Sequence, residues 1–137
     1  MSGRPDRLLE ALRWAEKADH DLRNAEHTLL LEVDCPFDTV CFHAQQCVEK
    51  YLKAALIWQS VTIPRTHDLR MLVQLAETES AVVLDLEVIL PLNRYAVEAR
   101  YPGEWEPIGR EEAEESVRVA RIVRGVVRAI LPDAPLL

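Results

Sequence analysis

The chain has 137 residues, of which 49% are hydrophobic and 28% are charged, a composition typical of one folded domain and unlike that of a disordered segment. Its formal net charge of −7 argues against broad electrostatic binding to nucleic acid, which needs clustered Lys and Arg. No apolar run approaches the ~20 residues that span a bilayer, and the N-terminus has no apolar signal segment. We therefore expect a single domain over residues 1–137, located in the cytoplasm and not in a membrane.

The cysteines and histidines favour neither disulfides nor a metal site. Three cysteines are spaced by six residues, without the paired spacing of zinc ligands: Cys35, Cys41 and Cys47. Four histidines are scattered over three segments: His20, His27, His43 and His67. We expect Cys41 and Cys47 to be packing residues in a reducing compartment, and we predict no metal and no cofactor.

The first helix is predicted from about Pro5 to Leu31, because Pro and an acidic residue are both favourable in a first turn. Its core stripe recurs every three or four positions: Leu8, Ala11, Leu12, Ala15, Ala18, Leu22, Ala25 and Leu29. Trp14 lies off the middle of this stripe, within reach of a neighbouring helix or a dimer partner. The connection over residues 32–36 is short, which favours an antiparallel second helix.

The second helix is predicted over residues 37–57, which contain neither Gly nor Pro. One side is apolar: Phe37, Val40, Cys41, Ala44, Cys47, Val48, Tyr51, Leu52 and Ala55. The other side has a polar row beside Phe42: His43, Gln46, Lys50 and Lys53. A helix with an apolar face and an aromatic residue on its polar face is expected to be central and to contact more than one neighbour.

The remaining segments also have helical patterns. Thr66 is the N-cap candidate of a short third helix, with Asp68 in its first turn. A fourth pattern runs from Val82 towards residue 99 and is kinked or divided at Pro91. The last helix is predicted from about Arg110 to the proline at position 132, with glutamates near its start and arginines further along. These segments predict an all-α, up-and-down bundle of about five helices.

Three stretches together resemble the signatures of one family. They are residues 42–54 (FHAQQCVEKYLKA), 64–69 (PRTHDL) and 95–102 (YAVEARYP). In this order they resemble the HEPN (higher eukaryotes and prokaryotes nucleotide-binding) domain, and the similarity covers nearly the whole chain. The resemblance implies a bundle of about five helices that often forms homodimers. It also implies a minimal nucleotidyltransferase as partner, in a pair that resembles a toxin–antitoxin module.

Many HEPN proteins resemble metal-independent ribonucleases, with an Arg followed four to six residues later by a His. The His acts as a general base or acid on a 2′-hydroxyl, and the Arg stabilises the phosphate charge. Here Arg94 is followed at the expected distance by Ala99, and no His occurs after His67. We therefore predict no catalytic residue. The alternative is a ribonuclease toxin with a displaced base, His43 or His67, working with Arg94 or Arg100.

A non-catalytic HEPN protein still needs a binding site. If the second helix packs beside the helix that ends near residue 101, seven side chains converge on one groove: His43, Gln46, Lys50, His67, Arg94, Arg100 and Tyr101. Cations, an amide and an aromatic ring suit the phosphate and base of a nucleotide. The structural alternative is that these residues hold the bundle together, with His43 and Gln46 as buried hydrogen-bonding partners. A structural dimer without a ligand also stays open.

Overall fold

The computed structural model describes residues 4–79, 82–99 and 101–133, and all the regular structure in these ranges is helical. Four helices are long: α1 (Arg4–Leu29), α2 (Phe37–Trp58), α3 (Leu69–Glu79) and α6 (Arg110–Ile130). Three short pieces follow one another directly: α4 (Leu86–Ile89), η1 (Leu90–Arg94) and α5 (Tyr95–Glu98). With these pieces taken as one irregular helix, the predicted all-helical bundle of about five helices is confirmed.

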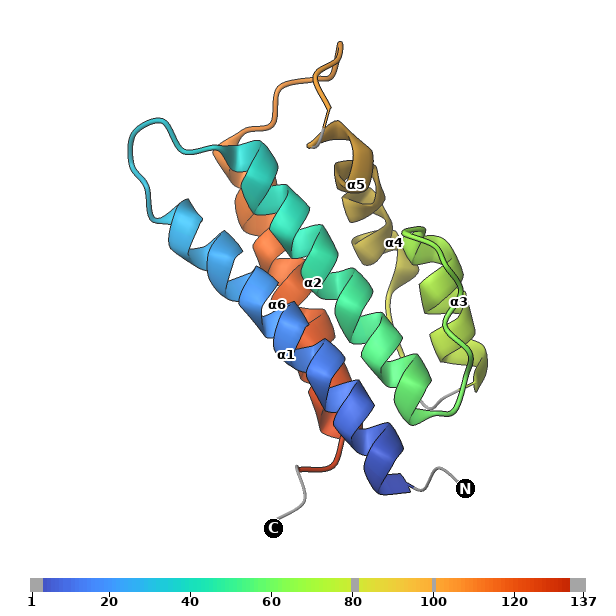
Figure 1. The fold of residues 1–137 in the computed structure, drawn as a ribbon. Coiled ribbons are helices and arrows are strands. Elements are labelled where there is room, and N and C mark those ends of the chain that lie inside the picture. The colour runs from blue at the N-terminus through green and yellow to red at the C-terminus, as the bar shows by residue number, and fades with distance from the viewer. Residues whose placement is uncertain (1–3, 80–81, 100, 134–137) are drawn as a thin grey trace.

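Helix α2 lies at the centre of the bundle. It contacts α1 and α6 on one side and α3, η1 and α5 on the other, and Figure 1 shows it between these elements. Its predicted apolar stripe is buried except for Phe37, which is partly buried, and the thiols of Cys41 and Cys47 are buried and form no disulfide. Burial raises the pKa of both thiols, which keeps them protonated and inert. The prediction of a central helix is confirmed.

The third helix begins later than predicted. The Thr66 hydroxyl accepts a hydrogen bond from the Asp68 amide at 3.0 Å and does not cap the helix. The cap is Asp68, whose carboxylate accepts from the Arg70 amide at 3.0 Å and whose carbonyl accepts from the Leu72 amide at 3.2 Å. The prediction of Thr66 as N-cap was wrong, because Asn93 contacts the Leu69 amide and the Asp68 carboxylate and so fixes the start of the helix at Leu69.

The fourth pattern is also shorter than predicted. Its first residues are not helical, and α4 begins after Asp85, whose carboxylate accepts from the Glu87 amide at 3.0 Å. Around Pro91 the α-helix gives way to the tighter 3₁₀ helix η1, because proline lacks the backbone donor that an α-helix needs. Asn93 in η1 accepts a hydrogen bond from the Leu69 amide at 2.9 Å, which ties this segment to the start of α3.

Within the ranges that the structure describes, no helix is long and apolar enough to cross a bilayer.

Candidate functional site

Two of the predicted site residues meet on a carboxylate of α1. Asp21 is only 8% exposed, and its two oxygens lie 2.8 Å from His43 Nδ1 and 2.6 Å from Lys50 Nζ. Burial alone would raise the pKa of Asp21, but the hydrogen bonds from His43 and Lys50 outweigh this effect. They hold the pKa below 3.8, the ordinary value of an aspartate carboxyl. Asp21 is therefore ionised and fixes both α2 side chains against α1.

Two other predicted residues belong to a network around Glu49, which is 3% exposed. Its carboxylate lies 3.0 Å from Lys53 Nζ and 2.9 Å from His67 Nδ1, and it accepts a hydrogen bond from Gln45 Nε2 at 3.1 Å. Gln46 donates to Gln45 Oε1 at 2.7 Å, so it joins the same network. The contacts of Glu49 with Gln45 and Lys53 are buried, whereas His67 reaches the same carboxylate from the surface.

Arg94 lies against α6. Its guanidinium donates to Glu112 at 2.7 Å and pairs with Glu98 at 2.9 Å. The hydroxyl of Tyr95 donates to the same Glu112 carboxylate. Arg94 therefore links η1 and α5 to the first turn of α6, and its charge is already matched by two carboxylates.

The other predicted residues lie apart from these networks. Tyr101 is 59% exposed, and its carbonyl accepts a hydrogen bond from Trp105 Nε1 at 2.9 Å. Arg100 lies outside the described residues. The six described candidates thus divide among separate sets of partners and do not share one contact network, while their role in binding a nucleotide stays a prediction.

A hollow of about 460 Å³ opens beside Lys50. It is lined by one residue of α2 and four of α1: Lys50, Arg13, Trp14, Glu16 and Lys17. The indole of Trp14 is packed against the core, and the ammonium of Lys53 lies 5.6 Å from its ring centroid. Because Lys53 is itself held by Glu49, the buried network fixes the ring that forms one wall of the hollow.

The charge of this hollow is positive. Arg13 and Lys17 are exposed, and within the described ranges neither forms an ion pair, whereas Lys50 is shared with Asp21. Glu16 is the single carboxylate in the lining. Arg13 and Lys17 were not predicted as site residues, although an aromatic residue between two cations within about one helical turn was a usable signal in the sequence.

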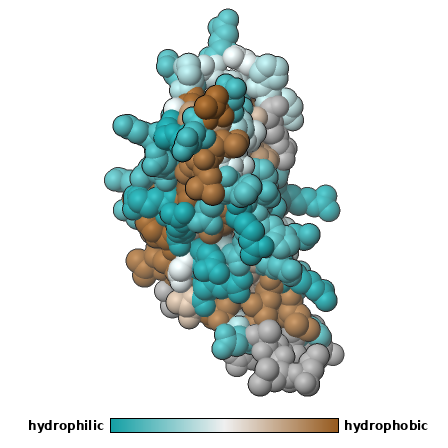
Figure 2. Space-filling model, turned by 90° about the vertical axis from the view of Figure 1, so that its left-hand side faces the viewer, coloured by the Kyte–Doolittle hydropathy of each residue, from teal (hydrophilic) through white to brown (hydrophobic). Residues whose placement is uncertain are grey.

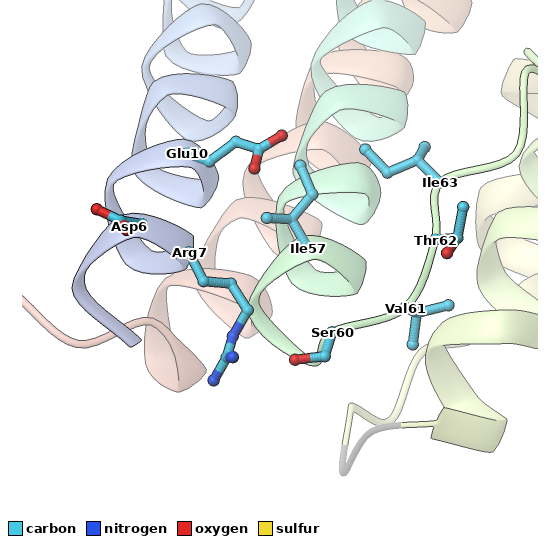
Figure 3. Close-up of a pocket in the computed structure, with 8 residues that line it drawn as sticks. All are labelled: Asp6, Arg7, Glu10, Ile57, Ser60, Val61, Thr62 and Ile63. Carbon is cyan, nitrogen blue, oxygen red and sulfur yellow. The ribbon is translucent and has the colours of Figure 1, made fainter. Parts of the chain in front are cut away.

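A different hollow, of about 370 Å³, lies where α1 begins and α2 ends. It is lined by Asp6, Arg7 and Glu10 of α1, by Ile57, and by residues 60–63 (Figure 3). Its one cation is already engaged, since Arg7 donates from Nε to the carbonyl of Trp58 at 3.0 Å. Two carboxylates remain, so this hollow is poorly suited to a phosphate.

A family model described as the HEPN domain matches residues 11–130. The chain belongs to the HEPN family. Similar folds are found in TT1696 from Thermus thermophilus (29% identity, TM-score 0.70, 87% of this chain and 96% of that one) and in ST0689, an archaeal HEPN homologue (20% identity, TM-score 0.67, 89% and 98%). The search of proteins with curated functions found no match.

The Arg–His motif of the HEPN ribonucleases is incomplete in this sequence, as noted above. Arg94 is bound by Glu98 and Glu112, and the position of the missing base is Ala99. Of the two displaced bases considered, His43 is bonded to Asp21 and His67 to Glu49. In the part of the chain that the structure describes, neither imidazole shares a partner with Arg94, and Arg100, the other arginine of the ribonuclease alternative, lies outside that part.

Proposed function

We propose that this HEPN protein is a non-catalytic subunit that binds a nucleotide in the hollow beside Trp14. The proposal rests on one observation: the hollow combines an aromatic ring with three cations, Arg13, Lys17 and Lys50. An aromatic face stacks on any nucleobase, and guanidinium and ammonium groups donate charge-assisted hydrogen bonds to phosphate. The volume of about 460 Å³ is in the usual range for small-molecule sites.

A free nucleotide fits the charge distribution better than a nucleic acid does. The chain has a formal charge of −7, which opposes binding to an extended phosphate backbone. The hollow is a local exception, with three cations and one carboxylate in its lining. A ligand with a few phosphates and one base uses this local charge without meeting the acidic surface elsewhere.

The predicted residues have different roles in this proposal. Lys50 contacts the ligand, and Asp21 and His43 position its ammonium. Gln46 and His67 support the network of Glu49, which through Lys53 holds Trp14. Arg94 and Tyr101 lie among other partners and are assigned no ligand contact.

The proposal includes the partners that the family resemblance implies. A minimal nucleotidyltransferase, encoded beside a HEPN protein in a toxin–antitoxin-like pair, is the proposed partner, and the bound nucleotide is a ligand that such an enzyme also recognises. Recovery of a small nucleotidyltransferase with the tagged protein from a lysate of its host, identified by mass spectrometry, is the expected result. Recovery of the protein without a nucleotidyltransferase would contradict the proposed partner. It would not bear on the proposed nucleotide site.

Reversing the two unpaired cations is expected to abolish binding. We expect the R13E/K17E variant to bind ATP, GTP, CTP or UTP at least about 100-fold more weakly than the unaltered protein in isothermal titration calorimetry, because charge-assisted hydrogen bonds contribute about 1.5–3 kcal/mol each. Both side chains are exposed, so the fold is expected to persist. The matched control is R65E/R70E, which makes the same change in net charge at two exposed arginines away from the hollow.

Two results would contradict the nucleotide site. One is the absence of binding for all four nucleotides at millimolar concentration. The other is an equal change of the dissociation constant in R13E/K17E and in R65E/R70E, since the effect would then come from net charge and not from the hollow. Thermal unfolding of each variant separates loss of binding from loss of fold.

A further inference from the structure

Helices α1 and α6 pack against each other (Figure 1), and a hollow of about 390 Å³ opens where they meet. Seen from the α1 side, the surface shows many hydrophilic side chains beside a strip of hydrophobic ones (Figure 2). The lining of this α1–α6 hollow is mostly charged and comes from both helices: Asp19, Leu22, Arg23, Glu26, Arg121, Arg124 and Gly125. A charged ligand therefore suits it better than an apolar one.

The arginines give the α1–α6 hollow a positive balance. Arg121 donates from Nε to Glu26 at 2.7 Å, and Arg124 donates from Nε to Asp19 at 2.8 Å. A guanidinium has five N–H donors, so both arginines keep donors that these carboxylates do not use. Arg23 is exposed and forms no ion pair with any described residue. The hollow thus has one uncompensated cation and two further guanidinium groups.

The carboxylates in the lining act as supports for two of these arginines. Asp19 also accepts hydrogen bonds from the Tyr51 hydroxyl and from Arg128, so it is tied to α2 as well as to α6. It therefore holds the guanidinium of Arg124 in place before any ligand arrives. Such preorganisation lowers the entropic cost of binding.

Gly125 lines the same hollow from the interior of α6, where glycine is less favourable than alanine. A Cβ built at this position meets no atom within 4 Å. Packing within the chain therefore does not require glycine, and the space before it is open. A ligand that approaches the helix backbone beside Arg121 and Arg124 explains why no side chain fills this space.

We propose that the α1–α6 hollow binds a free chain of phosphates, such as pyrophosphate. Guanidinium groups form paired, charge-assisted hydrogen bonds with phosphate oxygens. One guanidinium satisfies a carboxylate ligand, whereas linked phosphates offer terminal oxygens on several sides, as guanidinium groups on two helices require. Among the described residues, no aromatic ring lines this hollow, so nothing in it stacks on a nucleobase. The site is therefore separate from the nucleotide site proposed beside Trp14.

Calorimetric titration of the full chain with sodium pyrophosphate, in about 150 mM salt, tests the site. We expect R23Q to bind at least about 10-fold more weakly, because a group that donates charge-assisted hydrogen bonds is lost. R70Q makes the same change in charge at an exposed arginine of α3 and should leave the dissociation constant unchanged. G125L should abolish binding by filling the hollow without lowering the melting temperature, since leucine is a good helix former and its Cβ has free space.

Two further titrations separate this hollow from the one beside Trp14. R13E/K17E should bind pyrophosphate as the unaltered protein does, because neither residue lines the α1–α6 hollow. ATP should not displace pyrophosphate from R13E/K17E, because the hollow has no ring for the base. Displacement would mean that the phosphates of a nucleotide, and not a free chain, are the ligand, and would overturn the proposal.

The proposal is also overturned by absence of binding at millimolar pyrophosphate, by equal weakening in R23Q and R70Q, or by undiminished binding in G125L. Loss of pyrophosphate binding in R13E/K17E would assign it to the Trp14 hollow instead. The pyrophosphate titrations do not depend on whether the Trp14 hollow binds a nucleotide, so the two proposals can fail separately.

Discussion

Replacing Glu49 with alanine is expected to lower the free energy of unfolding by about 3–5 kcal/mol. The Glu49 carboxylate accepts from Gln45 and contacts Lys53 and His67, and it is almost fully buried. Removing it leaves the Lys53 ammonium desolvated without a counter-charge, which costs more than the pair itself contributes. Urea unfolding followed by circular dichroism measures the loss.

The control for this prediction replaces both members of the pair. In E49L/K53M the buried charges are exchanged for apolar groups of similar volume, so the part of the loss caused by the unpaired Lys53 should return, while the buried Gln45 amide still lacks its acceptor. His67 loses a partner in the double variant at little cost, because its side chain is 62% exposed and water replaces the carboxylate. A double variant as unstable as E49A would show that lost packing, and not the unpaired Lys53, causes the effect.

Replacing Asp19 with alanine is expected to cost about 2–3 kcal/mol. Asp19 of α1 accepts hydrogen bonds from the Tyr51 hydroxyl and from Arg124 and Arg128, the two arginines at 2.8 Å each. One carboxylate therefore joins α1, α2 and α6. Its loss leaves the partly buried Tyr51 hydroxyl and Arg128 guanidinium without their shared acceptor. Equilibrium unfolding at neutral pH measures the difference.

The same residue contributes to the acid sensitivity of the fold. Burial alone would raise the pKa of Asp19, but hydrogen bonds from Arg124, Tyr51 and Arg128 hold it below 3.8. A carboxyl with a depressed pKa stabilises the fold above its unfolded pKa, and this contribution is lost as the pH falls through the folded pKa. D19N should therefore lose less stability than the unaltered protein as the pH falls below about 4. If the free energy of unfolding fell equally for the two proteins as the pH is lowered, this role of Asp19 would be refuted.

Much of the fold follows from the sequence. The apolar spacing placed α2 within one residue of its observed end, and α6 begins at Arg110 as predicted. The burial of Cys41 and Cys47 follows from the same spacing. Periodicity is reliable here because both helices are long and bury a continuous stripe.

The first residues of α3 and α4 were harder to predict from the sequence. Thr66 and Asp68 are both good caps, and the choice between them depended on where Asn93 and the η1 turn meet α3. The loss of helix before Leu86 likewise has no periodic signal, because Val82 and Leu84 fit a helical stripe in sequence. Such boundaries are fixed by tertiary contacts, which a one-dimensional pattern does not contain.

The partners of the polar row were the main gap in the predicted site. His43 and Lys50 were predicted as members of one polar row on α2, but Asp21 was not predicted as their partner, because the register between α1 and α2 decides which carboxylate faces them. The same register brings Arg13 and Lys17 to the hollow that Lys50 lines. The sequence therefore predicted which face of α2 contributes to the candidate site. The residues of α1 in that site depend on how the two helices pack, which the sequence pattern does not show.

The most direct test of the nucleotide site uses the three tryptophans as reporters. Trp14 lines the proposed hollow, Trp58 lies beside the Arg7 hollow, and Trp105 lines a hollow with Glu98 and Glu106. In a two-dimensional ¹H–¹⁵N NMR titration, with Trp14 assigned through W14F, we expect a nucleotide to shift the Trp14 indole signal and to leave the other two in place. A Trp14 signal unmoved at a saturating nucleotide concentration, or a shift confined to Trp58 or Trp105, would contradict it.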